Sequence, residues 1–170
     1  VYIGRVVGIG KTETGRPLVV YGVSGRSEAS RQRRAVPYRT RIAIEPLEMT
    51  DEQRQQAALL LYDAIKVYNA QEGNPDWPFA IVSNGRHTDS LNNVCRTHLS
   101  LDKNGLQETL KRWGPEPDRY NTPRIMAVNS LSGHHAMGII TQANRPRIIT
   151  FMDDYGPAGK ALTLSTYSGY

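Results

Sequence analysis

Short segments in which apolar and polar residues alternate recur along this chain, and they constrain its fold more than any other feature. A repeat of two residues places successive side chains on opposite faces of a β-strand. Gly15 and Pro17 separate the first two such segments, "VYIGRVVGIG" and "LVVYGVS", so residues 1–24 are predicted to form a hairpin. The pattern favours a fold built mainly from antiparallel strands.

The same pattern predicts further strands later in the chain. One is expected in "VPYRTRIAIEP", where Arg41, Ala43 and Glu45 alternate with Ile42 and Ile44. The remaining predicted strands are "FAIVS" at 79–83, "PRIMAVNS" at 123–130, "HAMGIIT" at 135–141, "PRIITFMD" at 146–153 and "KALTLSTYS" at 160–168.

Two segments carry helix signals instead. Thr50 and Gln53 have the spacing of a capping box, which predicts a short helix at about 51–60. A second short helix is predicted in "LQETLKRW", at 106–113, because "GPEPD" follows as a stop signal. The segment "LYDAIKVY", at 61–68, fits both a helix and a strand, and we favour the strand.

Composition indicates one globular domain over residues 1–170. The chain is 39% hydrophobic and 22% charged, without repeats or a low-complexity linker. No apolar run approaches the roughly 20 residues that span a bilayer, and no segment resembles a signal peptide. The one cysteine, Cys95, excludes an intrachain disulfide and is expected to be a buried structural residue. We therefore expect a cytoplasmic protein.

The charge balance favours an anionic partner. The chain has 21 basic and 16 acidic residues, a net charge of +5, and a basic cluster at 31–41. Charge alone leaves nucleic acid, nucleotide and phosphorylated metabolite open. However, the aromatic residues do not alternate with basic ones as they do in proteins that bind single-stranded nucleic acid.

A polar run, "SNGRHTD", starts at Ser83 at the end of one predicted strand and is longer than a surface turn requires. His87 has a side chain that titrates near neutral pH, and Asn84 pairs a donor with an acceptor suited to an amide or a base edge. Thr88 and Asp89 are expected either to orient His87 or to cap a helix near Ser90. The run predicts a ligand-binding loop, with a simple turn and an exposed His87 as the alternative.

A second polar stretch, "SGRS", lies after the first hairpin. The hydroxyls of Ser24 and Ser27 and the guanidinium of Arg26 suit a phosphate or carboxylate, and Gly25 permits a close approach. The alternative is a polar turn with an exposed arginine.

Several common site patterns are absent from the sequence. His134 and His135 are adjacent in a predicted strand, so they point to opposite faces and do not indicate a metal site. The chain has no GxxxxGK[ST] loop, no GxGxxG fingerprint and no GxSxG elbow. These absences remove the simplest support for kinase, redox and serine-hydrolase functions.

Three segments together carry a family resemblance. "YIGRVVGIGKTETGRPLVVYGVSGRS", "AIVSNGRHTD" and "YNTPRIMAV" occur in this order and resemble the archaeal-type IMP cyclohydrolase family over residues 2 to about 167. The resemblance implies an α+β fold with antiparallel sheets: the four-layer αββα sandwich of the N-terminal-nucleophile hydrolases, without their nucleophile. Val1, which has no hydroxyl or thiol, agrees with that.

The resemblance also implies an activity. Family members close the second purine ring by converting 5-formamido-imidazole-4-carboxamide ribonucleotide to IMP with loss of water. This reaction requires no metal and no other cofactor. We therefore expect a phosphorylated imidazole or purine ribonucleotide as the partner, rather than nucleic acid or a membrane, and the sequence leaves a homo-oligomer open.

Site residues follow from matching positions of the family. Arg26 would stabilise an oxyanion or hold the carboxamide, Tyr62 would relay a proton, and Glu116 would be a base. The expected substrate-binding residues are Ser24, Ser27, Arg31, Asn84, Gly85, His87, Thr88 and Asp89.

The chain also departs from the family pattern. Gly22, Gly25 and Arg86 stand where the family usually carries other residues, which leaves open an altered substrate or lost chemistry. The alternative functions are a non-catalytic purine-nucleotide-binding module and, more remotely, an amide hydrolase with an N-terminal nucleophile exposed by processing.

Overall fold

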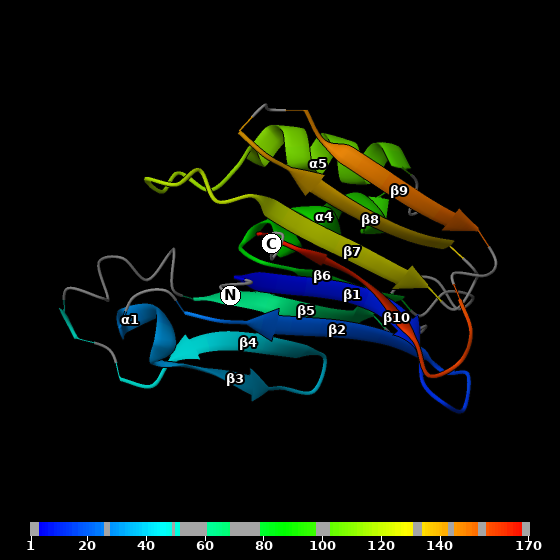
Figure 1. The fold of residues 1–170 in the computed structure, drawn as a ribbon, viewed down its shortest axis with the longest axis horizontal. Coiled ribbons are helices and arrows are strands. Elements are labelled where there is room, and N and C mark those ends of the chain that lie inside the picture. Colours follow the sequence, from blue (N-terminus) through cyan, green and yellow to red (C-terminus); the bar gives the residue numbers. More distant parts are fainter. Residues whose placement is uncertain are drawn as a thin grey trace.

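The structure, a computed structural model, describes residues 4–25, 28–48, 50–51, 61–68, 79–97, 103–130, 134–142, 145–152 and 156–167. These residues form a mostly β fold with two antiparallel sheets, one of three strands and one of seven (Figure 1). None of the described helices is long and apolar enough to cross a membrane.

The larger sheet has the strand order β3-β4-β5-β6-β7-β8-β9, so each strand pairs with its neighbours in the sequence. All its pairs are antiparallel. Its strands are β3 (Arg33–Pro37), β4 (Arg41–Pro46), β5 (Tyr62–Tyr68), β6 (Phe79–Ser83), β7 (Arg124–Ser130), β8 (His134–Ile140) and β9 (Arg147–Met152).

The smaller sheet joins the two ends of the chain. Strand β1 (Arg5–Lys11) lies between β2 (Pro17–Val23) and β10 (Ala161–Ser165), with Val7 opposite Tyr21 on one side and Leu164 on the other. Strands β1 and β2 pack over β6 and β7 of the larger sheet. This packing positions Tyr21 of the small sheet close to strand β5.

Two helices cover the opposite face of the larger sheet. Helix α4 (His87–Thr97) packs on β5 and β6, and helix α5 (Lys103–Trp113) packs on β8 and β9 (Figure 1). The central strands are apolar on both faces, as burial between two layers requires. In β6, for example, Ile81 packs in the cluster beneath the helices, whereas Val82 packs in the cluster beneath the small sheet.

Most predicted strands are confirmed. Strands β1 and β2 form the hairpin predicted for residues 1–24, and the strand favoured for residues 61–68 is β5. The strand predicted in "VPYRTRIAIEP" is confirmed over Arg41–Pro46 as β4, but the segment is not one strand, because the chain reverses there and β3 pairs with β4. Tyr38 N–H donates to Arg41 O at 2.7 Å and closes this turn.

The helix predictions have mixed outcomes. The predicted helix at 106–113 is confirmed as α5, although α5 begins earlier, at Lys103. Helix α4 begins at His87 rather than near Ser90, and the short helix α1 (Glu28–Arg31) was not predicted. The helix predicted at about 51–60 lies outside the described residues, apart from Asp51, which is helical.

Candidate active site

A cavity of about 140 Å³ opens where strand β6 ends. Because β5, β6 and β7 are antiparallel neighbours, the end of β6 lies beside the first residues of β5 and β7, Tyr62 and Arg124. The lining residues are Tyr62, Asn84, Gly85, Arg86, Trp113, Glu116, Pro117 and Arg124.

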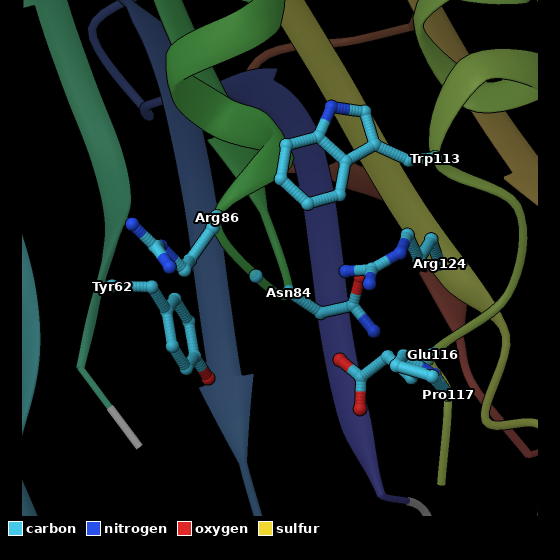
Figure 2. Close-up of a pocket in the computed structure, with 8 residues that line it drawn as sticks. Tyr62, Asn84, Arg86, Trp113, Glu116, Pro117 and Arg124 are labelled. Carbon is cyan, nitrogen blue, oxygen red and sulfur yellow. The ribbon is translucent and has the colours of Figure 1, made fainter. Parts of the chain in front are cut away.

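The lining side chains form two facing groups (Figure 2). Tyr62 and Arg86 lie on one side, and Trp113, Arg124 and Glu116 lie on the other. The Arg124 guanidinium and the Glu116 carboxylate point toward the side on which Tyr62 lies. The cavity therefore brings a phenol, a carboxylate and a guanidinium into one space.

Asn84 lines the cavity and is held there by two hydrogen bonds to the backbone. Its Oδ1 accepts from Ile125 N–H at 2.8 Å, and its Nδ2 donates to Pro123 O at 2.8 Å. These bonds join the end of β6 to the start of β7. They also occupy much of the donor and acceptor capacity that we expected Asn84 to use in reading an amide or a base edge.

Gly85 lies where three polar groups meet. A Cβ atom at this position would lie 3.0 Å from Arg124 Nη1, 3.3 Å from His87 Nδ1 and 3.5 Å from Glu116 Oε1. The first two distances are tighter than ordinary van der Waals contact, so a larger residue would push against the guanidinium. The missing side chain thus lets these groups approach one another.

Arg124 is a buried cation whose side chain has few protein partners. Its residue is 6% exposed, its Nη1 lies 3.4 Å from His87 Nδ1, and its guanidinium carbon lies 5.1 Å from the Trp113 ring centroid. Among the described residues no carboxylate forms an ion pair with it, and its Nε has no hydrogen-bond partner.

Burial lowers the pKa of Arg124, and the nearby charge of Arg5 adds to this, against the opposing effect of Glu116. An arginine nevertheless stays charged at neutral pH. Burying a cation without a direct ion pair is costly, and such groups are common at functional sites. Arg124 is therefore suited to stabilise an anionic group in the cavity.

Glu116 is held by an ion pair. Its Oε2 accepts from Arg5 Nη1 at 2.8 Å, and both side chains are largely buried. Burial alone would lower the pKa of Arg5, but the charge and hydrogen bond of Glu116, together with the interactions with Tyr62 and Tyr21, outweigh it, and the pKa of Arg5 is raised. The pair orients Glu116 so that its other oxygen, Oε1, lies on the Gly85 side.

Tyr62 is bonded to a second tyrosine behind it. The Tyr62 and Tyr21 hydroxyl oxygens lie 2.5 Å apart, and the two rings pack edge to face. Burial, followed by the interaction with Tyr62, raises the pKa of Tyr21 well above its ordinary value. Tyr21 therefore remains protonated at neutral pH, and its hydroxyl can donate a hydrogen bond to Tyr62 or accept one from it.

His87 is fully buried and does not line the cavity. Its Nε2 lies 3.2 Å from Ile125 O. Burial and the charge of Arg124 lower the pKa of His87 to about 3. The expectation that His87 titrates near neutral pH is therefore wrong, and so is the alternative of an exposed histidine.

Thr88 and Asp89 also lie outside the cavity lining. The single hydroxyl hydrogen of Thr88 is shared between two carbonyl oxygens, Asp63 O at 2.7 Å and Gly85 O at 2.9 Å from Oγ1, which anchors the start of α4. The Asp89 side chain is 57% exposed and forms an ion pair with Lys66. Residues Asn84 to Arg86 of the polar run thus line the cavity, whereas its later residues, from His87, form the start of α4.

Of the phosphate candidates in and after "SGRS", the two that the structure describes, Ser24 and Arg31, do not line this cavity. Ser24 is exposed, and its hydroxyl bonds to the N–H and C=O of Gly4 at 3.1 and 2.9 Å. Arg31 is exposed and donates to Gly25 O at 3.3 Å. Arg26 and Ser27 lie outside the described residues.

Sequence reasoning missed several residues that the fold brings to the site. Arg124, Trp113 and Pro117 line the cavity, and Arg5 and Tyr21 support Glu116 and Tyr62 from the small sheet. Arg124 lies within the "YNTPRIMAV" segment, which was a usable signal. Arg86, noted in the sequence only as a departure from the family pattern, also lines the cavity.

Comparisons with known proteins identify the family. A family model described as "IMP cyclohydrolase-like protein" matches residues 2–169. The IMP cyclohydrolase of Methanococcus maripaludis (strain C6) is 31% identical over 166 residues, which cover 98% of this chain and 74% of the relative. The IMP cyclohydrolase of Methanocaldococcus jannaschii is 32% identical over 127 residues, which cover 75% of this chain and 56% of the relative. The chain therefore belongs to the family of IMP cyclohydrolase-like proteins.

Proposed function

We propose that this chain is an IMP cyclohydrolase, which converts 5-formamido-imidazole-4-carboxamide ribonucleotide to IMP and water. The family match over residues 2–169 carries this proposal. The cavity supports it, because Tyr62, Glu116 and Arg124 supply a proton donor, a base and a cation at one place. The formylated ribonucleotide is also anionic, which fits a chain with a net charge of +5.

The reaction is intramolecular, so the cavity has to select a reactive conformation rather than bring two molecules together. The carboxamide nitrogen attacks the formyl carbon, and a C–N bond forms as negative charge develops on the formyl oxygen. One proton from that nitrogen ends on the formyl oxygen. The resulting hydroxyl then leaves as water with the formamide N–H proton, and a C=N bond forms in the closed ring.

Each step has a candidate group in the cavity. Glu116, oriented by Arg5, accepts the proton of the carboxamide nitrogen. Tyr62, bonded to Tyr21, donates a proton to the formyl oxygen, and the proton held by Glu116 then restores the Tyr62 hydroxyl, so that one proton has passed from the nitrogen to the oxygen. Arg124 stabilises the charge on that oxygen before it is protonated.

The role of Arg26 rests on its match to the family motif. This residue lies outside the described part of the chain. We propose that it holds the carboxamide or shares the oxyanion with Arg124. Ser24, Ser27 and Arg31 remain candidates for the phosphate, which would then extend from the cavity toward this segment.

We also propose the four-layer αββα architecture, in one domain over residues 1–170. A helix layer packed on a seven-stranded sheet, which packs on a second sheet, supports this arrangement (Figure 1).

Product identification tests the proposed function. Purified protein is incubated with the formylated ribonucleotide, and the products are separated by chromatography and weighed by mass spectrometry. We expect IMP, lighter than the substrate by one water, at a rate proportional to protein concentration. Unchanged substrate, under conditions where a known IMP cyclohydrolase converts it, would overturn the proposal.

A further inference from the structure

We propose that His87 is a positioning residue of the reaction, which holds the Arg124 guanidinium where it stabilises the charge on the formyl oxygen. This inference rests on the proposed ring closure. It assigns a role to a buried histidine that does not touch the cavity.

The hydrogen bonds of His87 define its tautomer. Ile125 O is an acceptor only, so His87 Nε2, at 3.2 Å, carries the hydrogen and donates it. The ring is neutral at physiological pH because burial and Arg124 lower the pKa of His87 to about 3. His87 Nδ1 therefore has a free lone pair, which faces Arg124 Nη1 at 3.4 Å.

The charges around the ring favour this neutral state. Arg124 and Arg5 both act on His87 as positive charges, and Arg124 Nη1 is within hydrogen-bond distance. The Trp113 ring centroid lies 6.5 Å from that of His87, and Trp113 Nε1 donates to Ser90 Oγ at 2.8 Å. A protonated imidazole would face Arg124 with like charge, so His87 serves as an acceptor.

Arg124 depends on this acceptor because it has few other supports. Its guanidinium contacts the Trp113 ring, but that contact does not fix the direction of the N–H groups. Among the described residues, His87 Nδ1 is the hydrogen-bond acceptor recorded for the guanidinium. Loss of this acceptor would let the guanidinium turn away from the reacting oxygen.

The backbone around His87 keeps the ring in place. His87 is the first residue of α4, and Thr88 ties that start to Gly85 O and Asp63 O. Gly85 leaves the space in which His87 Nδ1, Arg124 Nη1 and Glu116 Oε1 converge. The turn after β6 therefore positions the acceptor, His87 Nδ1, and leaves the space that the Arg124 guanidinium occupies.

Two substitutions of His87 separate its two hydrogen bonds. His87→Asn places an oxygen near the position of Nδ1 and keeps an acceptor for Arg124. His87→Gln places an amide nitrogen near the position of Nε2 and keeps the donor for Ile125 O. We expect His87→Gln to lower kcat by about 10- to 100-fold with little change in KM, because the guanidinium is misplaced. His87→Asn should recover most of that loss.

A second set of variants tests whether His87 acts through Arg124. In an Arg124→Met background, His87→Gln should lower kcat no further, because the group it positions is gone. The control pair is His135→Asn and His135→Gln, at a buried histidine of β8 that does not line the cavity. Thermal unfolding of every variant reports any loss that comes from stability alone.

The outcomes distinguish this inference from the proposed function. If wild-type protein forms IMP but both His87 variants lose the same kcat, or only KM changes, the positioning role is wrong and the function stands. If wild-type protein forms no IMP, the function fails. Nitrogen-15 NMR of wild-type His87 at pH 7 then tests the contact between His87 Nδ1 and Arg124 Nη1. We expect a neutral ring with its hydrogen on Nε2, and a hydrogen on Nδ1 would overturn the positioning role.

Discussion

The hydroxyl oxygens of Tyr21 and Tyr62 lie 2.5 Å apart, although strands β2 and β5 belong to different sheets. Tyr62 lines the cavity, whereas Tyr21 lies behind it and is bonded to it. Arg5 makes a second link of this kind, because it reaches from β1 to Glu116. The small sheet therefore supports both proton-transfer candidates without lining the cavity.

Removing the hydroxyl of Tyr21 should weaken catalysis less than removing that of Tyr62. We expect Tyr62→Phe to lower kcat by about 100-fold or more, since it removes the proposed general acid. Tyr21→Phe should lower it by about five- to tenfold, the equivalent of one lost hydrogen bond. Steady-state kinetics measure both, with Tyr38→Phe, at an exposed tyrosine bonded to Glu45, as the control. Wild-type kcat in Tyr21→Phe would contradict the proposed support of Tyr62.

The raised pKa of Tyr21 predicts a loss of stability in alkali. The folded protein keeps this hydroxyl protonated above pH 10, whereas the unfolded chain releases the proton there. The contribution of Tyr21 is thus fully present below about pH 10 and is lost as pH rises further. Urea unfolding from pH 8 to 11 should show a steeper decline for wild-type protein than for Tyr21→Phe. Equal slopes would mean that the pKa of Tyr21 is not raised.

The lowered pKa of His87 predicts a loss of stability in acid. Between pH 6.5 and about 3 the unfolded chain binds a proton at His87 that the folded protein does not. The free energy of unfolding should therefore fall as pH is lowered through this window, by up to about 1.4 kcal/mol per pH unit. Comparing wild type with His87→Asn between pH 7 and 5 isolates this effect from the carboxylates. A difference independent of pH would show that His87 titrates alike in both states.

Gly85→Ala should impair catalysis through Arg124. The added Cβ would lie 3.0 Å from Arg124 Nη1, so the guanidinium must shift by a few tenths of an ångström. We expect a loss of about tenfold in kcat with a small change in stability. Gly22→Ala is the matched control, because its Cβ would make an ordinary contact of 3.6 Å with Val6. Similar kcat values for the two variants would contradict the crowding at Gly85.

Asp89→Asn should have little effect, in contrast to the expectation from the polar run. Asp89 is exposed and pairs with Lys66 away from the cavity lining. Loss of an exposed ion pair costs at most about 1 kcal/mol of stability. We expect kcat/KM, measured from the ultraviolet absorbance change during IMP formation, to stay within about twofold of wild type. A loss as large as that of Tyr62→Phe would place Asp89 at the substrate after all.

Much of the sheet could be predicted, because alternation follows directly from burial on two faces. The sequence of residues 61–68 fits both a helix and a strand. These residues form a strand because they pair with β4 and β6. The turn between β3 and β4 was missed because Tyr38, Arg39 and Thr40 include none of the usual turn residues. The local sequence pattern therefore predicts where strands occur more accurately than where they begin and end.

The site was only partly predictable for a different reason. Tyr62 and Glu116 follow from their positions in the family motifs, and the structure places both at one cavity. His87 and Arg124 are buried beside Trp113 of a different element, whose ring centroid lies 6.5 Å from the His87 ring centroid and 5.1 Å from the guanidinium carbon of Arg124. Such burial is a tertiary property, so polar residues that looked like an exposed loop became part of an interior network.

The initial rate of IMP formation, followed by ultraviolet absorbance, tests the central claim most directly. Wild-type protein is compared with Glu116→Gln, which removes the proposed base, and with Glu45→Gln at a carboxylate outside the cavity lining. We predict turnover by wild type and Glu45→Gln and a loss of about 100-fold or more in Glu116→Gln. No turnover by wild-type protein, together with saturable binding of IMP in calorimetry, would contradict the account and indicate a nucleotide-binding protein.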